Sequence, residues 1–241
     1  MTVTKLSVQF LFMLFMVNAA FGQRGVTTFG IQYKPIMPNS IIGTFEQDFN
    51  SNQFTSTVKQ KIGHAFSFVI RQGLTKTLSF ETGLGFTRRN FNLDFAVEDS
   101  NYFKEGKVGF IGYEVPVKGL VFIRLGEALY MNTAIGASFN YFPSDIRVDL
   151  PIGVNEYFSQ EGAYRSKVQG ALLADIGFEF RTRKSGYFYL GSSYNLPFNP
   201  IVTFAMAYEY EGGDEVAIDN IRGSYLTIDF RYYFHEKPRS E

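Results

Sequence analysis

Charged side chains recur at alternating positions within several apolar stretches, and their spacing limits the chemistry they could do. Asp229 and Arg231 are two residues apart, and Glu114 and Lys118 are four apart. Residues two or four apart share one face of a strand. Each pair could therefore be an acid–base or proton-relay set, or a salt bridge that fills a closed interior, and filling is favoured because a buried charge needs a partner. The whole set is Arg71, Glu81, Glu114, Lys118, Asp175, Glu179, Arg181, Asp229 and Arg231.

Residues for other chemistry are scarce. His64 and His235 are the only histidines, so no Ser-His-acid set is visible, and the absence of cysteine removes thiolate metal sites, catalytic thiols, disulfides and an acylated lipoprotein cysteine. Carboxylate pairs in the polar segments lack the spacing of a calcium loop. Gly83-Leu84-Gly85 is not followed by a helix, as a phosphate loop would require. The sequence therefore predicts no enzyme, cofactor or metal site.

The elements that must position the charges are strands, because apolar and polar residues alternate with period two. The clearest case is the last apolar stretch, where Leu226, Ile228 and Phe230 share one face and Asp229 and Arg231 the other. Residues 201–210 either continue the seventh strand beyond a proline-containing bend or stand alone. The predicted strands cover residues 25–34, 62–71, 78–89, 109–123, 129–142, 168–181, 187–196 and 226–234.

The connections between these strands alternate in length. Three are short turns and four are long, an alternation typical of outer-membrane β-barrels. The predicted fold class is therefore all-β, an eight-stranded antiparallel transmembrane up-and-down β-barrel, with both termini and the short turns in the periplasm and long loops outside. The short connections are 72–77, 124–128 and 182–186, and the long ones are 35–61, 90–108, 143–167 and 197–223.

Alternation alone does not say which face points inward, because a soluble lipocalin-like barrel has the same period. The polar faces are rich in glycine, which suits a narrow lumen. They also carry the charges, and an Arg or Lys turned to the membrane midplane would cost ~2–4 kcal/mol. Tyrosines fall near strand ends, where an interfacial girdle would stand. The predicted girdle is Tyr33, Tyr113, Tyr130, Tyr141, Tyr187, Tyr194 and Tyr232.

The N-terminus predicts the compartment. Lys5 precedes an apolar run over residues 10–17, and Ala20-Phe21-Gly22 follows, which together indicate a signal peptide over residues 1–22. The run is short for a retained helical anchor, which is the alternative. The remaining residues, 23–241, form the predicted barrel domain of the cell outer membrane. Acidic and basic residues balance at 23 each, so there is no overall field to attract nucleic acid.

Three features resemble a known family: Gln23 after the signal peptide, Tyr-Glu-Val-Pro-Val at 113–117, and the aromatic run at 223–234. The chain resembles the eight-stranded outer-membrane β-barrel proteins of Bacteroidota, a group that includes PorT-like and OmpA-like barrel domains. The resemblance implies the fold and says almost nothing about activity. It also implies a closing-strand signal for the barrel-assembly machinery at Phe234, although residues 235–241 follow it here.

Three functions stay open. The first is a structural or interaction protein whose long loops bind an envelope or secretion-system partner, a variant that the PorT-like members imply. The second is a rim enzyme acting on outer-membrane lipid, and the third is a narrow channel for small solutes. Eight strands leave room for side chains but not for an open pore, so the loops are the expected site of function. The expected partners are outer-membrane lipid, the barrel-assembly machinery and such an envelope protein.

Overall fold

The computed structural model describes residues 26–42, 45–51, 54–97, 102–153, 155–182 and 184–235. The predicted signal peptide, residues 1–22, lies outside this range. None of the described residues forms a helix long and apolar enough to span a membrane. The elements are β1 (Thr27–Met37), β2 (Glu46–Asn50), β3 (Phe54–Gly73), β4 (Leu78–Val97), β5 (Tyr102–Arg124), β6 (Leu129–Tyr141), β7 (Ile146–Pro151), β8 (Tyr157–Ala163), β9 (Val168–Arg181), β10 (Tyr187–Pro197), β11 (Val202–Tyr210), β12 (Gly213–Ile221) and β13 (Tyr225–Tyr233).

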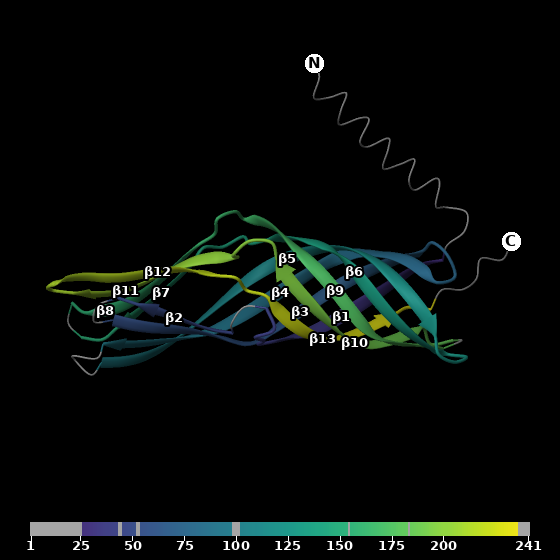
Figure 1. Cartoon of the computed structure of the whole chain (residues 1–241), viewed down its shortest axis with the longest axis horizontal. Coiled ribbons are helices and arrows are strands. Elements are labelled where there is room, and N and C mark those ends of the chain that lie inside the picture. Colours follow the sequence, from purple (N-terminus) through teal and green to yellow (C-terminus); the bar gives the residue numbers. More distant parts are fainter. Residues whose placement is uncertain are drawn as a thin grey trace, which may run out of the picture.

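Eight of these strands close into a barrel. The larger sheet runs β1-β13-β10-β9-β6-β5-β4-β3-β2, and β1 also pairs with β3, which joins the first strand to both of its neighbours. Every pairing in the ring is antiparallel, and Figure 1 shows the strands crossing the barrel at a slant. A closed ring leaves no unpaired edge. The predicted eight-stranded antiparallel barrel is confirmed.

The barrel wall places apolar side chains outside and charges inside. Phe68 and Ile135 expose 71% and 66% of their surface, whereas Glu81 and Arg231 expose 0% and 3%. This is the reverse of a soluble barrel, which buries its large apolar groups. An exterior of this kind suits hydrocarbon, where only a structure with internally paired backbone groups can cross.

The four long connections, predicted as loops, are largely folded, and this part of the prediction is wrong. They contain β2, β7, β8, β11, β12 and the outer parts of β3, β4 and β5, which project beyond the barrel and gather at one end of the molecule in Figure 1. The smaller sheet has the order β12-β11-β8-β7. Within it β11 is a separate strand, which settles the alternative left open for residues 201–210.

We call this end the extension: strands β2, β7, β8, β11 and β12 with residues 54–61, 90–97 and 102–108. Its two sheets enclose a hydrophobic core. Phe158 of β8 lies 5.8 Å from Phe54 of β3 and 5.1 Å from Phe95 of β4, between ring centroids. Rings from both sheets therefore meet in one core, which holds the former loops as a single folded body.

Strand β4 shows where the barrel ends and the extension begins. Up to Arg89 its inward positions are polar, as at Glu81, and from Phe91 to Val97 they are apolar and buried. The outward positions change in the opposite sense, from Leu84 and Phe86 to asparagine and aspartate. The period of two continues through this point, so the two faces exchange their chemistry without a break in the strand.

Candidate functional site

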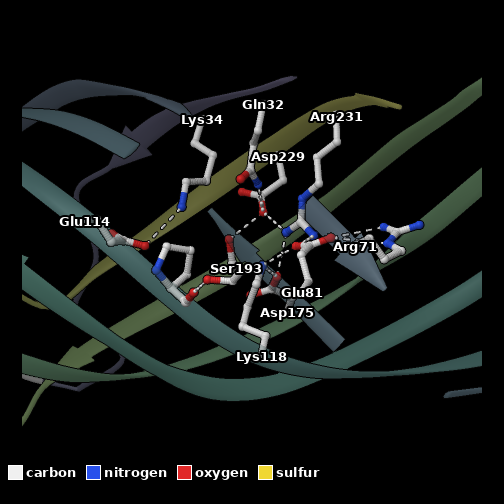
Figure 2. Close-up of polar contacts among 12 residues, drawn as sticks. Gln32, Lys34, Arg71, Glu81, Glu114, Lys118, Asp175, Ser193, Asp229 and Arg231 are labelled. Atoms are coloured by element: carbon white, nitrogen blue, oxygen red, sulfur yellow. Dashed lines mark hydrogen bonds and ion pairs between the residues drawn. The ribbon is translucent and has the colours of Figure 1, made fainter. Parts of the chain in front are cut away.

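The charges predicted for the lumen all occupy inward positions of the barrel strands. Arg71 comes from β3, Glu81 from β4, and both Glu114 and Lys118 from β5, while β9 and β13 supply the other five. Glu81 has no exposed surface, and three cations surround its carboxylate in Figure 2. Its oxygens lie 2.9 Å from Lys118 Nζ, 3.1 Å from Arg231 Nη1 and 3.3 Å from Arg71 Nη2. The hydroxyl of Tyr233 donates a further hydrogen bond to it, at 2.5 Å.

A second carboxylate, Asp175 of β9, binds two of these cations, Lys118 and Arg231. Its Oδ2 accepts from Lys118 Nζ at 2.7 Å and from Arg231 Nη2 at 2.5 Å. Arg231 also bonds Asp229 at 2.7 Å, and Asp229 accepts from Gln32 and Ser193 as well. Buried charges are tolerated when each is paired and hydrogen-bonded, and these contacts satisfy that condition.

The network continues toward the short turns. Arg71 Nη1 donates to Glu179 at 2.5 Å, and Glu179 accepts from Arg181 Nε at 2.7 Å. Arg181 in turn lies 4.1 Å from the ring of Tyr130 and 5.3 Å from that of Tyr187. These two tyrosines were predicted for the lipid-facing girdle. Both instead point into the lumen, because they share the parity of the inward residues on their strands. There their rings stack on the Arg181 guanidinium.

Eight of the nine predicted charges therefore form one connected group, the lumen network: Arg71, Glu81, Lys118, Asp175, Glu179, Arg181, Asp229 and Arg231. Glu114 lies apart from it. Its carboxylate is 3.7 Å from Lys34 Nζ and accepts from the Tyr225 hydroxyl at 3.1 Å, while Lys118 turns to Asp175. The sequence-based pairing of Glu114 with Lys118 is thus not the one adopted.

Sequence reasoning missed two inward cations, Lys34 and Arg89. Arg89 Nη1 donates to the carbonyl of Gly223 at 2.6 Å, and its guanidinium lies 4.5 Å from the ring of Tyr225. It sits where the polar lumen meets the core of the extension. Alternation places Arg89 on the polar face of its strand, so parity along the strand could have found it.

Small residues make room for bulky ones in the lumen. Gly177 and Gly191 face each other on β9 and β10, and the Tyr189 ring lies across both. A Cβ atom on Gly177 would stand 2.6 Å from Tyr189 Cζ, which is too close for contact. The lumen is therefore filled to the point where these two positions tolerate only glycine.

The remaining predicted residues lie on the wall. Tyr33, Tyr113, Tyr141, Tyr194 and Tyr232 all point outward by strand parity. Phe234 follows β13, exposes 47% of its surface and donates its backbone N–H to Phe29 at 2.8 Å. The hydroxyl of Tyr33 bonds His64 Nδ1 at 2.7 Å on the outer face. Among the described residues no group of His, Asp and Glu is arranged to hold a metal ion.

A solved structure shares this fold. The chain resembles the crystal structure of the outer membrane protein OprG from Pseudomonas aeruginosa over 88% of its own length and 98% of the other chain, with a TM-score of 0.54 and 12% sequence identity. The translocator domain of the autotransporter NalP from Neisseria meningitidis matches over 98% and 97%, with a TM-score of 0.24 and 9% identity. No family model and no curated protein matches the sequence.

The likeness to OprG shows the fold, that of an outer-membrane β-barrel. The apolar exterior of the ring is the surface that such a fold presents to lipid. A barrel of this architecture resides in the outer membrane, in agreement with the localisation expected from the sequence.

Proposed function

We propose that the chain is a structural or interaction protein of the outer membrane, in which the barrel anchors the extension and the extension binds another envelope protein. The observation that carries this proposal is the core shared by the two sheets of the extension. Packed side chains hold a surface in a fixed shape, and a fixed surface binds with less loss of conformational freedom than a flexible loop does.

The filled lumen supports a role for the barrel as a membrane anchor. Charges from opposite walls are bonded to one another across the interior, as Arg71 of β3 is to Glu179 of β9. A channel for small solutes needs a continuous open path, and side chains occupy that space here. A rim enzyme would need His, Ser and acid side chains together at the outer strand ends, whereas His64 is hydrogen-bonded to a tyrosine on the lipid-facing wall.

The outer face of β11 and β12 is the part of the extension best suited to a protein partner. Ile218 and Val216 expose 68% and 48% of their surface, and their cross-strand neighbours are Ala205 and Ala207. These four residues form an apolar patch on a body that projects from the barrel. Exposed apolar patches on such surfaces mark contacts with other proteins.

The resemblance to PorT-like proteins of Bacteroidota supports a more specific version of the proposal, a role beside a protein-secretion apparatus. In this version the short turns and both termini face the periplasm, and the extension faces the cell exterior. Insertion at assembly would then use the aromatic closing strand, with Phe234 as the residue read by the barrel-assembly machinery.

Affinity purification of the full chain from cross-linked native membranes tests the proposal. The matched variants are Ile218→Asp in the apolar patch and Thr55→Asp on the outer face of β3, each adding one charge to the extension. We expect the wild type and Thr55→Asp to retain a stoichiometric partner that Ile218→Asp loses. Recovery of the wild-type barrel alone, or equal recovery of partner by both variants, would contradict it. Conductance steps in planar bilayers would favour the channel instead.

A further inference from the structure

Three cations without ion-pair partners lie where the apolar band of the barrel meets the extension. They are Lys61 of β3, Arg88 of β4 and Lys107 of β5, and all three side chains are exposed on the outer face of adjacent strands. We call them the boundary cluster. The described residues offer none of the three an ion pair.

The register of β3, β4 and β5 shows how sharply the surface changes. A β-bulge between Lys61 and His64 shifts the pairing once, and outward residues then face each other in rows. Moving from the barrel to the extension, these rows are Phe66–Phe86–Tyr113, His64–Arg88–Ile111, Lys61–Asn90–Gly109, Lys59–Asn92–Lys107 and Thr57–Asp94–Glu105. The surface thus passes from aromatic to cationic to mixed within five rows.

On β3, β4 and β5 the acidic groups near the cluster lie on its side away from the barrel, and Asp145 lies beside Lys107 in a neighbouring cleft. Asp94 and Glu46 are each 3.2 Å from Lys59 Nζ, so Lys59 is already paired and lies outside the cluster. Glu105 is two residues from Lys107 on the same face, and no ion pair joins them. On the barrel side the next outward residues are aromatic. Arg88 lies over Gly109, with Nε 3.9 Å from where a Cβ would stand.

Two further features of the surface adjoin the cluster. Below it, the outer wall of β1, β3, β4 and β5 carries the aromatic side chains of Tyr33, Phe66, Phe86 and Tyr113. Beside it, a cleft of about 320 Å³ opens between β5 and β7, with Lys107, Ser144, Asp145 and Arg147 among its lining residues. An aromatic surface, a group of cations and a polar cleft therefore adjoin one another on this part of the wall.

We propose that the boundary cluster binds the phosphate groups of a phosphorylated glycolipid in the outer leaflet. Its acyl chains would lie along the aromatic row, and its sugars would reach the cleft beside Lys107. Phosphate offers several acceptor oxygens to Lys and Arg, and such charge-assisted bonds are strong. This inference rests on the proposed orientation, in which the extension faces the cell exterior.

Lipid titration of the purified, detergent-solubilised full chain tests the inference, with binding followed by native mass spectrometry. The probes are diphosphoryl lipid A, the same lipid without phosphate, and phosphatidylglycerol. The test variant is Lys61→Gln with Arg88→Gln and Lys107→Gln. Its control is Lys76→Gln with Arg124→Gln and Lys184→Gln, which removes equal charge from three turns at the other end of the barrel. A gel shift on boiling verifies that each variant is folded.

Diphosphoryl lipid A should bind the test variant about 100-fold more weakly than the wild type, from roughly fivefold for each lost charge. The control variant should bind as the wild type does, and removal of the phosphates should weaken wild-type binding to a similar degree. Equal loss in both triple variants, or wild-type affinity for the lipid without phosphate, would overturn the inference. Equal affinity for phosphatidylglycerol would replace the glycolipid with anionic lipid in general.

The experiments distinguish a failure of the lipid inference from a failure of the proposed protein partner. Ile218→Asp lies on the extension away from the cluster and should bind lipid A as the wild type does. The triple variant of the boundary cluster should still recover any protein partner that docks on β11 and β12. The two sets of variants therefore separate the lipid site from the protein site.

Discussion

The barrel and the extension are built from the same strands but filled in opposite ways. Strands β3, β4 and β5 run through both, and their inward positions are charged in the barrel, as at Arg71 and Glu81, and aromatic in the extension, as at Phe54 and Phe91. The barrel stands in hydrocarbon, so its apolar groups face outward. The extension stands in water, so its apolar groups face inward. The solvent thus decides the contents of each interior.

The two interiors are held together by different forces. In the lumen the charges are buried and are stabilised by their partners. The loss of one charged residue therefore leaves several others without a partner. In the extension the stabilisation comes from apolar burial and close packing, so truncation of one ring leaves a cavity and little else. Substitutions should therefore spread their effect in the barrel and confine it in the extension.

Glu81→Gln should lower the free energy of unfolding of the barrel more than any other substitution proposed. Glu81 neutralises Arg71, Lys118 and Arg231 together, and the amide leaves an excess of positive charge in a closed interior. Breaking a buried ion pair costs about 3–5 kcal/mol, and the whole barrel should be destabilised. The loss of stability is measured by urea unfolding in detergent micelles, with the gel shift on boiling as the readout of the folded fraction. Glu105→Gln on the exposed face is the control, and an unchanged midpoint for Glu81→Gln would mean that the network is not needed.

Phe158→Ala should destabilise the extension by a similar free energy but should leave the barrel folded. Phe158 is fully buried and stacks on Phe54 and Phe95, and Phe→Ala in a core costs about 3–5 kcal/mol. Limited proteolysis should cut the extension of this variant sooner, whereas its gel shift on boiling should stay that of the wild type. Phe103→Ala, at a position 62% exposed, is the control. Loss of the gel shift would show that the two regions fold as one unit.

The barrel could be predicted from the sequence because alternation, turn length and inward charge all point the same way. Parity along each strand placed Asp175, Glu179, Asp229 and Arg231 on the inner face without any structure. Asp229 and Arg231, a pair that their spacing predicted, do form an ion pair on one strand. Most of the other partners could not be predicted, because they come from other strands. Lys118 prefers Asp175, 57 residues away, to Glu114 on its own strand.

The extension escaped prediction for a physical reason. Residues 90–97 alternate as clearly as the membrane strands, with Phe91, Leu93 and Phe95 on one face, but that face is the one that carries charges before Arg89. A search for strands with an apolar lipid face ends where the faces exchange. An exchange of faces within a continuous alternation is the pattern that would have revealed a strand leaving the membrane.

The same substitution at two outward positions of β3 tests the solvent assignment itself. Phe68 exposes 71% of its surface in the apolar band, and Thr55 points outward in the extension. Phe68→Arg places a charge against acyl chains and should cost about 2–4 kcal/mol near the midplane, seen as a lower urea midpoint and slower folding into lipid vesicles. Thr55→Arg should stay within about 0.5 kcal/mol, the range of ordinary surface substitutions. If both arginines were tolerated equally, the face of β3 would be wet along its whole length, and the division of the molecule into a lipid-facing barrel and a water-facing extension would not hold.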